Sequence, residues 1–387
     1  MKKYKKGFSL VLVIIISIMG FFSMFGINTD NNKKQLSKDP IVRFAKNFES
    51  DYSAKFLFRD SFININYYIS LLLNKKDFTA NNVYKADGNF LFSYDENRVI
   101  EEKKDEKFYK DSISQLQYIN EDLSKNNIDF LYVLAPSRSV IDMNAYGIKD
   151  YSIDNHNSFV QELNSNNIPY LNIAESLTME KNDWFYKTDH HWTAESGFSA
   201  ALQSVEKLND LYGYNFDSSK LDASNFELVN YKKSFLGSIG VKVSKKYKKE
   251  NFSIYIPKTD TDFTYTVHTK YSSNVYNGKF SDAFLNINTL NNKNYLNKYA
   301  SLLYDISYYG EIKNNLTNSD KKLLLISDSF GRNYAPYLSF YFSEIKYIDP
   351  QKGRYTENVK ECIEEFQPTT VIYLCNGQSL YHVLNYW

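Results

Sequence analysis

The chain has 387 residues, enough for one large domain or two of ordinary size. Its 46 basic and 45 acidic residues leave a net charge of +1, which argues against a nucleic-acid-binding protein because such domains carry a basic excess. The two cysteines, Cys362 and Cys375, are too few for a disulfide framework and lack the spacing of a zinc site. We therefore expect no nucleic-acid partner, no disulfide scaffold and no cofactor.

Residues 1–28 are predicted to be an uncleaved signal anchor. Four lysines within residues 2–6 precede an uncharged run over 7–28, which as a helix is long enough to cross a hydrocarbon core of about 30 Å. Because positive charge stays inside, the N-terminus is expected in the cytoplasm and the rest of the chain outside a cell membrane that it spans once. A cleaved signal peptide is the alternative, but the run is long and no clear cleavage site follows it.

Two segments separate this anchor from the main domain. Residues 29–50 are polar and are predicted to be a linker. Residues 51–107 are expected to form an N-terminal region, with helical periodicity over 51–73 followed by short strands and turns. No chemistry can be assigned to either segment.

Residues 108–387 alternate between amphipathic helices and aliphatic strands. This pattern predicts a mostly parallel sheet covered by helices on both faces, with functional residues at the carboxyl ends of its strands. We expect helices over 110–126, 157–166 and 356–366, and strands over 128–134, 168–173, 322–326, 345–348 and 369–374.

A β-rich insertion is predicted over about 214–310. Apolar and polar residues alternate over 252–256 and 263–267, which indicates antiparallel strands. Basic residues cluster over 242–249. We interpret that cluster as a solvated hairpin tip, with contact to a membrane surface or an anionic polymer as the alternative.

The chemistry is concentrated in residues 183–193, which hold two of the five histidines between two of the three tryptophans. Residues two apart in an extended loop project to the same side, so Asp189 can meet His191 while His190 points elsewhere. A carboxylate that orients an imidazole makes a general base. Thr193 then reads as the N-cap of a helix over 194–212.

Two other interpretations of this stretch stay open. The first is a divalent-metal cluster, which is disfavoured because the sequence holds no second cluster of carboxylate and histidine. The second is a loop of aromatic residues with a purely structural role. We favour the general base, for which the partner would be a nucleophile.

The candidate nucleophile is Ser329, in the sequence Ser-Asp-Ser-Phe-Gly over 327–331. This turn follows the apolar strand 323–326, and a serine at a sharp turn from strand to helix exposes its hydroxyl above the sheet. The backbone N–H of Ser329 could also stabilise an oxyanion. Ser327 is the weaker alternative nucleophile.

Three further residues are candidates for binding substrate. Arg354 could hold an anionic or carbonyl group, or be an ordinary exposed arginine. Asn376 follows a predicted strand, and its amide could donate to an oxyanion, although Asn-Gly is also a common turn. Trp192 stands next to His191 and is the third candidate.

At these residues the chain resembles the DHHW proteins, Gram-positive relatives of the alginate O-acetylation enzymes, which contain an SGNH-hydrolase-like domain. The resemblance rests on Thr-Asp-His-His-Trp-Thr over 188–193 and Asp-Ser-Phe over 328–330. It extends to Ala-Pro-Ser-Arg over 135–138, the turn 233–238 and the strand end at Asn376. Ser327 departs from the pattern, because glycine is usual at that position.

The resemblance implies an SGNH-like, flavodoxin-like α/β fold in which Ser329 takes an acyl group, His191 acts as base and Asp189 orients His191. It further implies acetylation of a cell-surface polysaccharide from an acetyl donor, together with a multi-pass membrane O-acyltransferase. Two alternatives remain: a polysaccharide acetyl esterase that uses the same residues, and a non-catalytic protein that binds glycan or scaffolds an acylation complex.

Overall fold

A computed structural model describes residues 59–306, 308–350 and 355–375. By its internal contacts the chain divides into two compact units: Met1–Lys75 with Val243–Lys246, and Lys76–Lys242 with Tyr247–Trp387. The predicted anchor, the linker, Arg354 and Asn376 lie outside the described residues. Within the described ranges, none of the helices has the length and apolar character needed to cross a bilayer.

In the smaller unit, the periodicity over 51–73 gives helix α3, Arg59–Leu72. Tyr67 and Ser70 are its buried residues. Two contacts join the helix to the other segment of its unit: Ser244 Oγ donates to Asn64 Oδ1 at 2.6 Å, and Lys245 Nζ lies 2.7 Å from an oxygen of Asp60.

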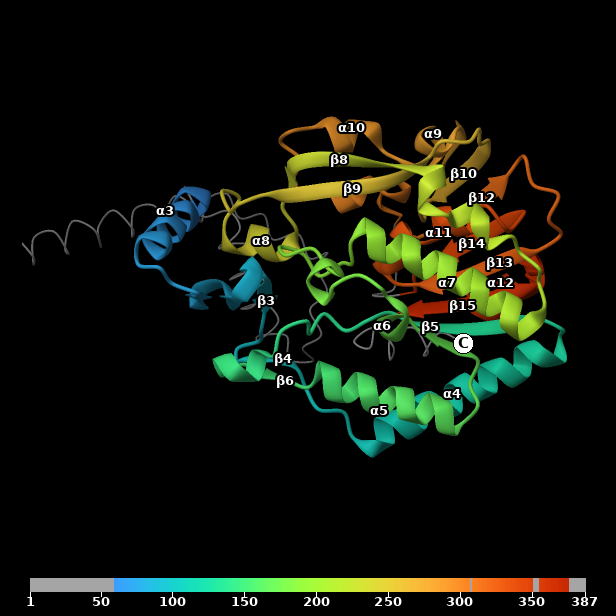
Figure 1. The fold of residues 1–387 in the computed structure, drawn as a ribbon, viewed down its shortest axis with the longest axis horizontal. Coiled ribbons are helices and arrows are strands. Elements are labelled where there is room, and N and C mark those ends of the chain that lie inside the picture. Colours follow the sequence, from blue (N-terminus) through green and yellow to red (C-terminus); the bar gives the residue numbers. More distant parts are fainter. Residues whose placement is uncertain (1–58, 307, 351–354, 376–387) are drawn as a thin grey trace, which may run out of the picture. The chain divides into compact units, whose positions relative to one another are not determined.

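The larger unit is built on one eight-stranded sheet with the order β11-β10-β12-β14-β13-β15-β5-β7 (Figure 1). The strands from β14 to β7 pair in parallel, whereas β11, β10, β12 and β14 pair antiparallel. The sheet is therefore mixed. Its strands are β5 Asp129–Leu134, β7 Tyr170–Asn172, β10 Phe263–His268, β11 Ser273–Gly278, β12 Tyr309–Asn314, β13 Lys322–Ser327, β14 Glu344–Ile348 and β15 Thr370–Cys375.

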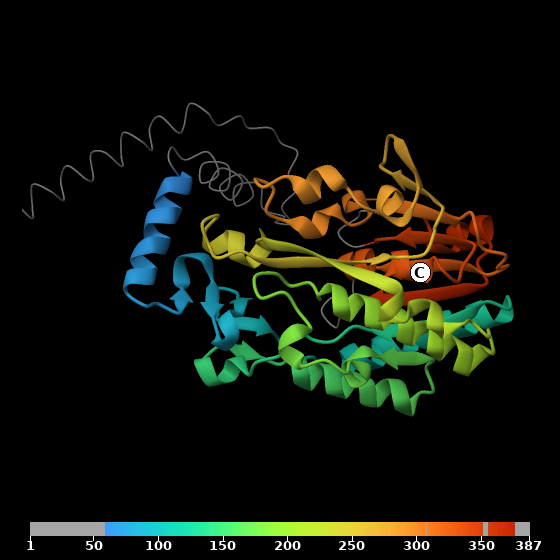
Figure 2. The ribbon, with the colours of Figure 1, turned by 45° about the horizontal axis from the view of Figure 1, so that its top comes forward.

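Helices cover both faces of this sheet, as expected. Successive strand residues point to opposite sides, and since these residues are apolar, both faces must be buried. In β13, for example, Leu324 packs in one apolar cluster and Leu325 in the other. The first cluster includes α4 Glu106–Lys125, α5 Ser152–Ser165 and α12 Val359–Phe366, and the second includes α7 Ala194–Tyr212, α9 Phe280–Phe284 and α11 Ala335–Leu338. Figures 1 and 2 show α4 and α5 together along one side of β5.

The short strands over 77–101, which we predicted within the N-terminal region 51–107, lie in the larger unit. Strands β1 Asp77–Phe78, β2 Val83–Lys85 and β3 Leu91–Ser93 form a small antiparallel sheet, and β4 Val99–Glu101 pairs in parallel with β6 Lys149–Asp150. The N–H of Leu91 also donates to the carbonyl of Lys187 at 2.9 Å. This bond attaches the segment to the loop that carries the histidines.

The predicted insertion divides into two parts. Strands β8 Phe226–Phe235 and β9 Glu250–Pro257 form a separate antiparallel pair, and their connection holds helix α8, Ser238–Val243. Strands β10 and β11 instead extend the main sheet through β12. The remaining α-helices of the described residues are α6 Ile173–Ser176 and α10 Ile287–Asn291.

Candidate active site

The structure brings Asp189, His191 and Ser329 into one hydrogen-bonded chain. Ser329 Oγ lies 2.7 Å from Nε2 of His191, although 138 positions separate the two residues. The other ring nitrogen, Nδ1, is hydrogen-bonded to Oδ1 of Asp189. Asp189 and His191 are buried while Ser329 is half-buried. An imidazole placed in this way can accept the hydroxyl proton while the carboxylate stabilises the imidazolium.

A tight loop positions the two histidines. Phe185 and Trp192 form an isolated antiparallel bridge, and the N–H of Tyr186 donates to the carbonyl of His191 at 3.1 Å. Thr193 caps α7, as predicted, by accepting a bond from the N–H of Ser196. His191 turns inward beside Asp189, whereas His190 is exposed and its Nδ1 lies 3.3 Å from Ser238 Oγ.

Asp189 is held by backbone from the β8–β9 connection. The N–H of Ser238 donates to Asp189 Oδ2 at 2.6 Å. A Cβ placed on Gly237 would lie 2.2 Å from the Asp189 Cβ, so only glycine permits this approach. Burial opposes the charge of Asp189, but the neighbouring imidazole of His191 and the Ser238 N–H outweigh it and hold the pKa of Asp189 well below its usual value.

Ser329 begins the 3-10 helix η9, Ser329–Asn333, directly after β13. Asp328 caps this helix by accepting a bond from the N–H of Phe330 at 2.9 Å. The carbonyl of Asp328 accepts three bonds, from the N–H of Gly331 and the hydroxyls of Tyr347 and Ser327. The turn is therefore fixed. Ser327, the alternative nucleophile, is fully buried in it.

Arg138, in the Ala-Pro-Ser-Arg segment after β5, ties the loop together from within. Its guanidinium donates to the carbonyls of Asp189 at 2.7 Å, Leu91 at 2.8 Å, Tyr186 at 3.1 Å and Lys187 at 3.2 Å. Burial lowers the pKa of Arg138 to about 10. Because these donors are engaged by backbone, Arg138 positions the loop that carries Asp189.

Glu250, the first residue of β9, fixes the start of the same loop. Its carboxylate accepts bonds from the N–H of Lys187 at 2.9 Å and the N–H of Thr188 at 2.8 Å. Thr188 in turn accepts from the N–H of Gly237 at 3.0 Å through its hydroxyl. Burial raises the pKa of Glu250. The β8–β9 pair thus supports Asp189 from two sides.

Tyr299, which the sequence analysis missed, contacts both His191 and Ser329. It lies in η7, Lys298–Ser301, and its ring stacks on the His191 imidazole with centroids 3.9 Å apart and planes inclined by 14°. Its hydroxyl donates to the carbonyl of Ser329 at 3.1 Å. One buried side chain therefore fixes the imidazole and the serine backbone together.

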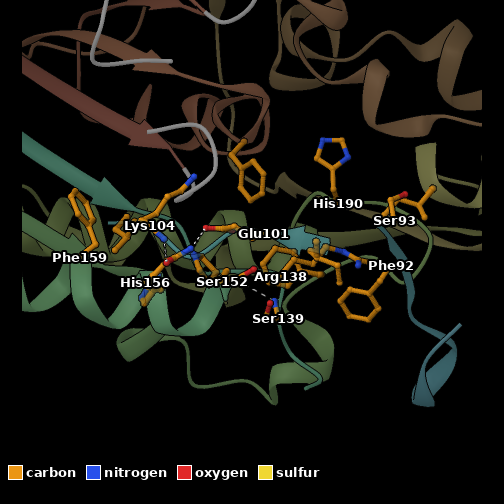
Figure 3. A pocket seen from close by; sticks show the side chains of 18 of the residues that line it. Phe92, Ser93, Glu101, Lys104, Arg138, Ser139, Ser152, His156, Phe159 and His190 are labelled. Carbon is orange, nitrogen blue, oxygen red and sulfur yellow. Dashed lines mark hydrogen bonds between the residues drawn. The ribbon is translucent and has the colours of Figure 1, made fainter. Parts of the chain in front are cut away.

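A cavity of about 440 Å³ is lined by Arg138 and by His190 and Phe330, the chain neighbours of His191 and Ser329. Figure 3 shows Arg138 and His190 in its wall. It lies past the carboxyl end of β5, where sheets of this class bind ligands. His190, Ser238 and Phe330 form its wall next to the serine and histidine, and Figure 3 shows Glu101, Lys104, His156 and Phe159 together elsewhere along it. Its volume is within the range of small-ligand sites.

A metal is poorly suited to the histidine cluster. Asp189, His190 and His191 each offer one ligand atom within 4.8 Å of the others. However, both carboxylate oxygens of Asp189 and both ring nitrogens of His191 are already engaged by neighbours within the protein. Binding a cation would require those hydrogen bonds to break.

Of the three residues predicted to bind substrate, the structure describes Trp192 alone. Trp192 is completely buried and packs against Phe330 and Tyr334, with ring centroids 5.1 and 6.4 Å away. We expected it to contact substrate; instead it supports the serine turn from inside, because the bridge to Phe185 directs it into the core. Arg354 and Asn376 lie outside the described residues.

Comparisons with known proteins confirm the resemblance noted in the sequence. Residues 83–241 match the family model described as the SGNH hydrolase-like domain of the acetyltransferase AlgX. This match includes Asp189 and His191 and ends before Ser329. Among curated proteins the comparison found no match.

Solved structures of the same fold cover most of the chain. Bacillus cereus PatB1, solved with a sulfonyl adduct, is 18% identical, with a TM-score of 0.59 over 77% of this chain and 97% of that one. A DHHW family protein from Eubacterium siraeum is 16% identical, with a TM-score of 0.52 over 78% and 92% of the two chains. These likenesses show an SGNH-like α/β fold.

Proposed function

We propose that the protein is an extracytoplasmic, serine-dependent O-acetyltransferase that modifies a cell-surface polysaccharide. The observation that carries the proposal is the 2.7 Å contact between Ser329 Oγ and His191 Nε2, with Asp189 on the opposite ring nitrogen. The match of residues 83–241 to the AlgX acetyltransferase domain supports the choice of the acetyl group. The polysaccharide acceptor follows from the resemblance to the alginate O-acetylation enzymes.

The chemistry would proceed in two displacements. His191 Nε2 takes the hydroxyl proton of Ser329 while the Oγ of Ser329 bonds to the carbonyl carbon of the acetyl donor. Collapse of the tetrahedral intermediate breaks the bond to the donor oxygen, which leaves with the proton returned by His191. A sugar hydroxyl then attacks the acetyl-serine in the same manner and regenerates Ser329.

The intermediate needs hydrogen-bond donors for its oxyanion. We assign this role to the backbone N–H of Ser329, near the start of η9, and to the side chain of Asn376. Removing one such donor commonly lowers kcat by 10² to 10³. Arg354 would bind a carbonyl or anionic group of a substrate.

The cavity beside His190 would hold the sugar acceptor. Its volume of about 440 Å³ and its position next to Phe330 suit a carbohydrate unit, with aromatic faces such as Phe92 and ionic groups such as Lys104 in its wall. The acetyl donor would be presented by a multi-pass membrane O-acyltransferase. The N-terminal segment 1–28 would anchor the chain in the same membrane.

A polysaccharide acetyl esterase is the second candidate, because the same three residues release acetate when water replaces the sugar hydroxyl. The two reactions share the acyl-enzyme and differ only in the acceptor. A non-catalytic scaffold is disfavoured, since it has no use for a hydroxyl, an imidazole and a carboxylate in sequential contact.

The test compares the full chain with Ser329→Ala on a chromogenic acetyl ester, with and without soluble polysaccharide fragments. We expect release by the parent alone, acetyl-Ser329 in the intact mass, and transfer to fragments faster than hydrolysis. A sulfonyl fluoride should label the parent and spare the variant. Equal release by both proteins would overturn the mechanism, and acetate without acetylated fragments would favour the esterase.

A further inference from the structure

Helix α3 exposes apolar side chains where a surface helix is normally polar. Leu72 is 86% exposed and Ile65 54%, and Tyr68 and Ile69 are exposed as well. Successive helical residues turn by about 100°, so these four side chains share an arc of about 100° on one face. Leu73 extends it at the end of the helix. An exposed apolar surface of this kind marks a contact site.

The same compact unit carries a basic excess. Val243–Lys246, part of the basic run noted in the sequence, belongs to the unit of α3 and is joined to it through Ser244 and Lys245. Among the described residues of this unit, the basic side chains are Arg59, Lys75, Lys245 and Lys246, and the one acidic side chain is Asp60.

We propose that α3 lies in the surface of an anionic lipid bilayer, with Ile65, Tyr68, Ile69 and Leu72 inserted among the lipids. Apolar side chains on one face and lysines in the same unit are the features of a helix that binds at a lipid interface. The basic excess favours anionic lipid headgroups over an apolar protein partner, because lysines near such a membrane each strengthen binding.

The polar side chains of α3 indicate that it lies on the bilayer and does not span it. Its described residues, Arg59–Leu72, include the charged pair Arg59 and Asp60 and the amides Asn64 and Asn66. The anchor proposed above would supply the membrane, because α3 begins about thirty residues after the apolar run 7–28 ends.

The experiment places an environment-sensitive fluorophore on α3 in the full chain, at Leu72→Cys within the arc or at the exposed Asn66→Cys outside it. Cys362 and Cys375 are buried, which leaves the introduced thiol as the accessible one among the described residues. In vesicles containing about 30% phosphatidylglycerol in phosphatidylcholine, we expect a blue shift and quenching by lipid-borne spin labels at position 72. Position 66 should remain aqueous.

Charge is tested with Lys245→Gln and Lys246→Gln. Each lysine near an anionic surface contributes about fivefold, so the ratio of inserted to aqueous probe at position 72 should fall about fivefold per substitution, and only when phosphatidylglycerol is present. High salt should have the same effect.

Two results would overturn the proposal. One is an aqueous probe at position 72 in anionic vesicles. The other is a probe shielded from water before lipid is added, which would mean that protein, from this chain or a second copy, covers the arc. Ser329→Ala should leave these measurements unchanged, so they stand apart from the acetyl-transfer chemistry.

Discussion

Gly237→Ala should remove most of the proposed activity, although it leaves Asp189, His191 and Ser329 themselves unsubstituted. The new Cβ would lie 2.2 Å from Cβ, 2.4 Å from Oδ2 and 2.7 Å from Cα of Asp189, whereas ordinary contacts begin at 3.4 Å. The carboxylate must therefore retreat by about 1.2 Å, and misplacements of about 1 Å commonly lower rates about 100-fold. The backbone of Asp189 cannot yield easily, because Arg138 holds its carbonyl.

The assay is release of acetate from a chromogenic ester, measured as kcat and KM for the full chain. We expect kcat to fall about 100-fold with little change in KM, since Asp189 acts through His191 and does not contact the ester. Gly213→Ala is the control: its φ of +64° makes alanine strained, but nothing lies within 4 Å of the added carbon. That variant should lose stability and keep its rate. If Gly237→Ala retains a third or more of the parent kcat, the positioning role of the β8–β9 connection is refuted.

Three further predictions follow from the same contacts. Tyr299→Leu should lower kcat/KM about tenfold and Tyr299→Phe by about threefold, because phenylalanine keeps the ring on His191; equal losses in the two variants would dismiss the stacking. Ser327→Ala should keep the serine-dependent rate and lose about 1 kcal/mol of unfolding free energy measured in urea, because one buried hydrogen bond is removed. If Ser327→Ala instead loses as much activity as Ser329→Ala, Ser327 would have to be considered the nucleophile. Because the pKa of Asp189 is lower in the folded than in the unfolded chain, its charge stabilises the fold above the unfolded pKa, and this stability is lost as the pH falls. The unfolding free energy of Asp189→Asn should therefore decrease less than that of the parent between about pH 5 and about pH 3. An equal decrease in the two proteins would contradict this.

The three candidate catalytic residues could be selected from the sequence because rare residue types in tight patterns carry a signal. Asp189 and His191 stand two apart in a histidine pair, and Ser329 stands at the end of an aliphatic strand. Local conformational preferences predict the direction of each side chain, and the structure then brings Ser329 and His191 into contact. The N-cap at Thr193 was equally accessible, because capping depends on neighbouring residues alone.

Residues that act through tertiary contacts were not accessible in this way. Tyr299 is one tyrosine among 34, and nothing in its neighbours indicates that it stacks on His191. The direction of Trp192 depends on a bridge to Phe185 that closes the loop. Arg138 lies in a segment that the family resemblance singled out, so that segment is the signal that could have revealed its positioning role.

Sheet partners were the least predictable part of the fold. Alternation over 263–267 correctly indicated a strand, but periodicity does not say which strand is its neighbour. β10 pairs with β12 and so joins the main sheet, which makes the sheet mixed where a mostly parallel one was expected.

The four carbonyls bound by Arg138 set a limit on how this protein can be shortened or recombined. One of them belongs to Leu91, which precedes the region that carries the histidines and the serine. A fragment starting near residue 108 would lack the Leu91 carbonyl that accepts a hydrogen bond from the Arg138 guanidinium. A chimera that takes the segment before residue 100 from a distant relative would have to place a carbonyl oxygen at the same position. The segment around Leu91 must therefore be kept together with the loop that carries Asp189 and His191 when the protein is shortened or recombined.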